Sequence, residues 1–89
     1  MEKKRKVIKI KAIPAERVEK ELIITTEFIK LDSALKLAGE AETGGHAKLM
    51  VSEGKVFVNG ERCLQRGKKL FDGDSFRVGA TVYKVVRLR

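Results

Sequence analysis

The 89-residue chain has few of the residues that build covalent or metal-bound frameworks: one cysteine, one histidine, one proline and no tryptophan. A single cysteine, Cys63, excludes an intramolecular disulfide, and with His46 it does not make a zinc ligand set. No apolar run approaches the roughly 18 residues that span a membrane, and lysines interrupt residues 6–11, so no secretory signal is formed. We therefore expect one small cytoplasmic domain with no metal or cofactor.

Acidic residues are outnumbered, since 20 Lys and Arg face 12 Asp and Glu and give a net charge of +8. The excess lies at the two ends: residues 1–11 hold 6 basic and 1 acidic residue, and residues 61–89 hold 8 and 3. A small body with this charge favours a polyanionic partner such as nucleic acid, although a merely solvating surface is the alternative.

Short periodic runs predict the elements of the first half. Alternation over residues 6–11 predicts an edge strand, residues 15–20 form a charged connector that has room for a helical turn, and β-branched residues predict a strand over 21–26. Asp32 is a predicted N-cap of a first short helix, which Gly39 interrupts. Thr43 is the predicted cap of a second helix over 44–53, which Gly54 ends.

The second half reads mostly as sheet. Asn59-Gly60 follows an alternating run and tolerates the positive φ of a type I′ turn, which predicts a hairpin. A turn at residues 72–74 precedes two more strands around Gly79. The expected class is α+β, with two short packed helices against a small, mostly antiparallel sheet. We expect residues 1–26 to be a basic arm with one or more strands and residues 27–89 to be the binding domain.

The order of these motifs resembles a known family. Leu31-Asp32 opens the first helix, Ala47-Lys48-Leu49 lies in the second, Gly54 to Gly60 reads Gly-Lys-Val-Phe-Val-Asn-Gly, and Gly73-Asp74 precedes the last strands. Over roughly residues 27–87 the chain is similar to the S-four (ribosomal small-subunit protein four, αL) RNA-binding domain family. Gly44-Gly45-His46-Ala47-Lys48 and Arg66-Gly67-Lys68-Lys69 resemble its small free-standing bacterial members of the YaaA and YbcJ kind.

The candidate RNA-binding residues are basic side chains and one helix start. Gly44 and Gly45 leave the first turn of the second helix open to a phosphate, or only permit the tight turn between the helices; the sequence leaves both readings open. His46 at the same place stacks on a base or donates to phosphate, or is only a surface or capping residue. The full candidate set is Lys30, Lys36, Gly44, Gly45, His46, Lys48, Lys55, Arg62, Arg66, Lys68 and Lys69.

Aromatic residues are scarce, and most of the five (Phe28, Phe57, Phe71, Phe76, Tyr83) sit in apolar alternation that predicts a place in the core. Stacking of splayed single-stranded bases is therefore not favoured, and structured RNA is the expected partner. No nucleophile and base, Walker pattern or paired carboxylate suggests catalysis.

The resemblance implies ribosomal RNA or a ribosomal particle as the target, in assembly, maturation or quality control. We expect the protein to be a monomer. The alternatives are an adaptor that docks an acidic protein and an accessory domain of an RNA-modifying enzyme.

Overall fold

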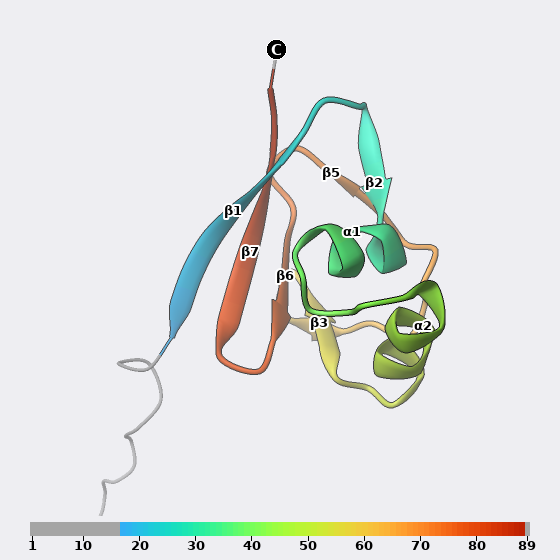
Figure 1. Ribbon diagram of the computed structural model, residues 1–89. Helices are drawn as coiled ribbons and strands as arrows, with labels where there is room; N and C mark the ends of the chain where they lie inside the picture. The colour runs from blue at the N-terminus through green and yellow to red at the C-terminus, as the bar shows by residue number, and fades with distance from the viewer. Residues whose placement is uncertain (1–16, 89) are drawn as a thin grey trace, which may run out of the picture.

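The computed structural model describes residues 17–88, which form two helices and seven strands (Figure 1). In chain order they are β1 (Val18–Ile24), β2 (Phe28–Lys30), α1 (Leu31–Leu37), α2 (Gly44–Ser52), β3 (Val56–Val58), β4 (Glu61–Arg62), β5 (Lys69–Phe71), β6 (Ser75–Val78) and β7 (Thr81–Arg87). The predicted α+β class with two helices is confirmed. The strand predicted over residues 6–11 lies outside the described residues.

A five-stranded sheet in the order β1-β7-β6-β3-β4 forms the main layer, and both helices lie on one side of it (Figure 1). Its β3–β4, β3–β6 and β6–β7 pairs are antiparallel, whereas β1 and β7 are parallel. A parallel pair needs a long crossover, and here the whole intervening chain provides it. The first and last described strands are thereby held side by side.

The predicted boundaries of the first described strand were wrong. Residues 18–20 belong to β1 and are no connector or helical turn, and residues 25–27 are a bend. The charged residues at the start of β1 stay exposed when the strand pairs with β7, so this pairing does not bury their charges. The partner that selects the strand lies about sixty residues away, and local sequence does not specify it.

The core lies between the helices and one face of the large sheet. Leu31, Ala34 and Leu35 of α1 and Ala47, Met50 and Val51 of α2 are buried there. Facing them are buried sheet residues that alternate with exposed ones, as the period of a strand requires: Leu22, Ile24, Val56, Val58, Phe76, Tyr83 and Val85. Within residues 17–88 no helix covers the other face of this sheet.

Tyr83 connects the sheet to the turn between the helices. Its ring is 4% exposed and stacks on Phe76 with centroids 5.0 Å apart. Its hydroxyl donates to the Glu40 carboxylate at 2.5 Å. Burial, the hydrogen bond to Glu40 and the Glu40 charge together raise the pKa of Tyr83 to about 12. This contact fixes the turn that sets α2 relative to α1.

The predicted turns are confirmed by their backbone angles. Asn59 has φ of 50° and Gly60 of 88°, the left-handed values of the β3–β4 hairpin. The Asn59 side chain also accepts from Ser75 N at 3.0 Å and donates to the Asp74 carboxylate at 3.3 Å. The other Asp74 oxygen accepts from Phe71 N at 2.8 Å. Asn59 therefore ties its own turn to the turn between β5 and β6.

One predicted cap is confirmed and the other is wrong. Thr43 Oγ1 accepts from His46 N at 3.0 Å and caps α2, which ends at Ser52, one residue before the predicted end. α1 begins at Leu31 with Lys30 as its N-cap residue, so Asp32 lies inside the first turn. The N–H groups of Leu31 and Asp32 donate to the carbonyls of Lys68 and Arg66. Because a distant loop satisfies these donors, no side-chain cap is needed.

A small second sheet was not predicted. β2 and β5 pair antiparallel, with Phe28 opposite Phe71, Ile29 opposite Leu70 and Lys30 opposite Lys69. Each strand has three residues, too short for alternation to be recognised locally. This sheet lies next to the start of α1 (Figure 1).

Candidate nucleic-acid interface

All eleven candidate residues lie within residues 17–88 and are exposed. Lys36 lies in the last turn of α1 and Lys48 in the middle of α2. Their neighbours Leu35 and Ala47 are fully buried, so the two lysines occupy the solvent-facing sides of the packed helix pair. Neither forms an ion pair with an acid among the described residues, which leaves both charges available to an anion.

The start of α2 is open at the backbone. Within residues 17–88 the N–H groups of Gly44 and Gly45 donate to no protein acceptor, whereas those of His46 and Ala47 bind Thr43. Neither glycine has a positive φ, and a Cβ on Gly44 would meet nothing within 4 Å. Neither strain nor crowding in the fold thus explains the two glycines. The free donors match what a phosphate oxygen would accept.

His46 has a capping role of its own. Its Nδ1 accepts from Glu42 N at 3.2 Å, while its backbone N–H is bound by Thr43. Because Nδ1 accepts this bond, Nε2 is the ring atom left to donate to another group. The structure therefore supports the capping interpretation of His46, and an added contact through Nε2 stays a prediction.

Arg62 and Lys55 lie at the other end of α2. A Cβ on Gly54 would come within 3.2 Å of the Arg62 side chain, so Arg62 lies across the end of the helix, opposite the Gly44 end. Its guanidinium is 5.4 Å from the Phe57 ring centroid. Lys55 is paired with Glu53 at 3.2 Å. Arg62 therefore does not lie beside the start of α2, because the hairpin follows α2 directly and stays at its C-terminal end.

Arg66 and Lys68 lie in the segment between β4 and β5. Arg66 forms an ion pair with Asp32 of α1 at 3.6 Å. The backbone of this segment also caps α1: the carbonyls of residues 66 and 68 accept from the first two N–H groups of the helix. These contacts hold the basic segment against the helix start, so its cations keep a fixed place beside α1. Lys68 has no ion pair with an acid in the described part of the chain.

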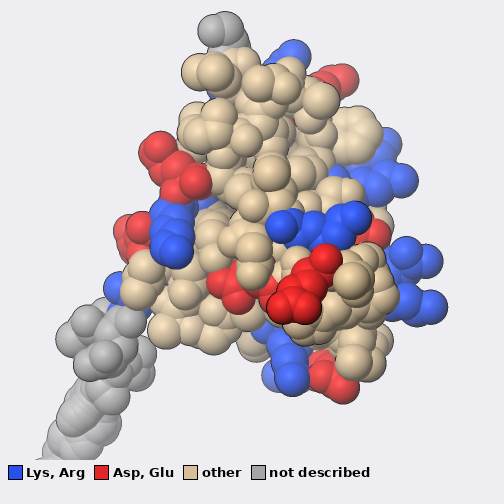
Figure 2. All heavy atoms as spheres, viewed as in Figure 1, with Lys and Arg blue, Asp and Glu red and all other residues tan. Residues whose placement is uncertain are grey.

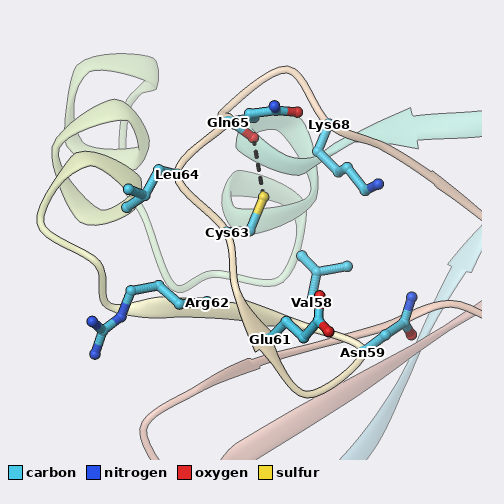
Figure 3. A pocket seen from close by; sticks show the side chains of 8 residues that line it. All are labelled: Val58, Asn59, Glu61, Arg62, Cys63, Leu64, Gln65 and Lys68. Carbon is cyan, nitrogen blue, oxygen red and sulfur yellow. Dashed lines mark hydrogen bonds between the residues drawn. The ribbon is translucent and has the colours of Figure 1, made fainter.

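A hollow of about 600 Å³ separates this segment from the hairpin (Figure 3). Arg62 and Lys68 stand on opposite sides of it, and the Cys63 thiol points inward and donates to the Gln65 carbonyl at 3.6 Å. The full lining is Val58, Asn59, Glu61, Arg62, Cys63, Leu64, Gln65 and Lys68. Its cations and amides suit an anionic, hydrogen-bonding ligand.

Lys30 and Lys69 meet on the small sheet, where the sequence did not predict them to pair. They are direct cross-strand partners, and Lys69 Nζ lies 4.7 Å from the Phe28 ring centroid. Sequence analysis also missed the exposed ring of Phe71 and the guanidinium of Arg77, 4.2 Å from the Phe57 centroid. The expectation that most aromatics are core holds for Phe76 and Tyr83 alone. One sequence signal could have indicated this pairing: Phe-Ile-Lys in β2 and Lys-Leu-Phe in β5 place like residues opposite each other in an antiparallel pair.

Figure 2 shows how charge is distributed on one face of the molecule. Blue side chains lie over the helices and along the margin formed by α2 and the segment that leads to β5, with a few red ones among them. Beside β1, on the opposite margin, red and blue side chains alternate. The described residues contain no group of three or more metal-ligating side chains. None of the helices in residues 17–88 is long and apolar enough to cross a membrane.

Comparison with known proteins agrees with this architecture. The S4 domain family matches residues 22–86. The chain is also similar to the "Probable ribosome maturation protein RlbA" of Bacillus subtilis (strain 168), with 49% identity over 51 residues, which are 57% of this chain and 72% of that protein. Residues 22–86, which match the family, contain both helices and the Asn59-Gly60 hairpin, together with the end of β1 and most of β7. The chain therefore belongs to the S4 domain family, as its sequence motifs predicted.

Proposed function

We propose that this protein is a non-enzymatic, cytoplasmic RNA-binding protein that binds structured RNA as a monomer and takes part in ribosome assembly, maturation or quality control. Its target is ribosomal RNA or a ribosomal particle. The observation that carries this proposal is a set of exposed cations that have no acidic partner within residues 17–88: Lys36 on α1, Lys48 on α2 and Lys68 in the segment held against the start of α1. The printed name of the similar Bacillus protein supports the ribosomal setting.

The mechanism is electrostatic and geometric. Lysines place point charges near phosphates, and the free N–H groups of Gly44 and Gly45 add two backbone donors at the positive end of α2. Arg66 forms an ion pair with Asp32, and its carbonyl accepts from Asp32 N, so both contacts keep this residue beside the start of α1. Contacts of this kind read the shape and backbone of RNA, which fits structured RNA better than a defined base sequence.

Binding to an RNA hairpin across a series of salt concentrations tests the proposal. Each phosphate neutralised should contribute about −0.7 to −0.9 to the slope of log affinity against log salt. We expect a steep slope and co-sedimentation of the protein with ribosomal particles that nuclease treatment abolishes. An affinity that does not depend on salt would contradict the electrostatic mechanism. Nuclease-resistant association with one acidic protein would favour the adaptor alternative.

A further inference from the structure

The outer face of the small sheet combines two cations with two aromatic rings. In β2 and β5, Leu70 is fully buried and Ile29 packs against the core, so alternation turns the other four side chains outward. These are Phe28, Lys30, Lys69 and Phe71. We call this face the β2–β5 platform.

The two lysines of the platform repel each other in the free protein. Lys30 and Lys69 are direct cross-strand partners, and like charges in that position destabilise a strand pair. Within residues 17–88 neither is paired with an acid. Glu27 and Asp72 lie nearby in sequence, but Asp72 accepts from Arg87 N at 2.8 Å, which holds it toward the end of β7. An anion between the two ammonium groups would remove the repulsion.

The two rings of the platform differ in availability. Lys69 lies over the Phe28 ring, which is therefore already in contact with a cation. Phe71 is 43% exposed, and its centroid lies 5.7 Å from that of Phe28 at an interplanar angle of 50°. Phe28 thus supports the Phe71 ring from the side and leaves it open to solvent. Phe71 N is also fixed by Asp74 at 2.8 Å, so the ring is carried by a held backbone.

We propose that the platform binds one unpaired nucleotide of the RNA, whose base stacks on Phe71 while its phosphate lies between Lys30 and Lys69. This inference rests on the proposed function and adds a second element to it: a single-stranded flank beside the structured part. An open ring next to cations is the combination that binds single-stranded nucleic acid without regard to sequence. It revises the sequence-based expectation that stacking of single-stranded bases on aromatic rings is not favoured.

The position of the platform suits this role. Lys30 is the N-cap residue of α1, and the segment carrying Arg66 and Lys68 runs directly into β5. An RNA whose structured part contacts α1 and this segment therefore has its end next to the platform. The RNA strand does not have to turn back to reach the platform from there.

Two RNA hairpins test the proposal: one blunt, with about 16 base pairs, and one with the same stem and about four unpaired nucleotides at its end, including 2-aminopurine. We expect the full chain to bind the second about tenfold more tightly and to quench its 2-aminopurine. Phe71→Leu keeps an apolar side chain but no ring, and it should abolish the preference while leaving blunt-stem affinity unchanged. Lys30→Gln should reduce the preference for the second hairpin. It should also make the slope of log affinity against log salt for that hairpin shallower by about one unit.

Ile23→Ala is the matched control, since Ile23 is 46% exposed but lies on the outer face of the large sheet. It should keep the wild-type preference. A preference retained in Phe71→Leu overturns the proposal, and so does an equal loss for both hairpins in a folded Phe71→Leu protein, since the ring would then serve the stem.

The failure of the proposed function is distinguishable from the failure of this inference. If the wild-type protein does not bind the blunt stem, the proposed function fails, and the unpaired 2-aminopurine strand alone then decides the role of the platform. Quenching of that strand that depends on Phe71 supports stacking, and no quenching overturns it. A glutamate-rich peptide that binds through Phe71 when the strand does not would assign the platform to an acidic protein instead.

Discussion

The two sheets each hold one cross-strand aromatic pair, and the pairs differ in their surroundings. In the large sheet Phe76 and Tyr83 are 1% and 4% exposed, nearly parallel at 19°, and covered by the helices. In the small sheet Phe28 and Phe71 are tilted at 50°, and their outer face carries two lysines and is covered by no helix or strand of residues 17–88. The same pairing thus contributes to the core in one sheet and forms a surface in the other. What differs is whether a second layer covers the face.

Truncating one ring of each pair should separate the two roles most strongly. Phe76→Ala should lower the free energy of unfolding by about 3–5 kcal/mol, because it leaves a cavity in the core. Phe71→Ala should lower it by only about 1 kcal/mol, since an exposed aromatic pair contributes little beyond its area. Urea unfolding of both variants measures this difference. Equal losses would mean that the small sheet is as much part of the core as the large one.

The link between the sheets runs through Asn59 and Asp74, and breaking it should have the next largest effect. Asn59→Val should lower the free energy of unfolding by about 2–3 kcal/mol, because a β-branched residue resists φ of 50° and the bonds to Ser75 and Asp74 are lost. Asn59→Gly keeps the turn conformation and isolates the side-chain contribution. An unchanged melting temperature in Asn59→Val would contradict the role assigned to this turn.

Tyr83→Phe separates the stacked ring of the large sheet from its hydroxyl. We expect a loss of about 1–2 kcal/mol near neutral pH, since Glu40 loses its donor. The pKa of Tyr83 is raised to about 12 in the folded protein, against about 10 in an unfolded chain. Between pH 10 and 12 the unfolded chain therefore releases a proton that the folded protein keeps, and stability falls as pH rises through this range.

Below pH 10 the Tyr83 contribution should be complete and constant. Tyr83→Phe should remove the part of the alkaline loss that comes from this residue, so the stabilities of variant and wild type converge as pH approaches 12. Chemical unfolding at a series of pH values measures the convergence. A constant difference between the two proteins across pH 10–12 would show that the hydroxyl titrates normally.

Charge reversal compares the helix side with the β1 side of the molecule and should have the smallest energetic effect. Lys48→Glu and Arg66→Glu should each weaken RNA binding about tenfold at fixed salt, whereas Arg87→Glu, at the end of β7, should weaken it less than about threefold. All three alter net charge equally, so a difference among them reports local contact. Equal losses would mean that the protein attracts RNA as a diffuse cation.

The parts of the fold that were predicted correctly depend on local preferences. Asn59-Gly60 and Gly54 mark positive φ, and Thr43 marks a helix start, because few residue types satisfy these conformations. Asp32 failed as a cap for the opposite reason: the donors it would have satisfied are bound by carbonyls of a loop more than thirty residues away. Such a partner leaves no signal near the helix.

By itself the sequence determined the family, through the resemblance of its ordered motifs, and the two helices and the hairpin, through short-range periodicity and turn chemistry. Only the tertiary structure decided that β1 lies parallel to β7, that β2 and β5 form a second sheet, and that Lys30 and Phe71 share its outer face. Pairing between strands distant in sequence depends on the competition among all possible partners. Three-residue strands carry too little pattern to resolve that competition before the core has formed around them.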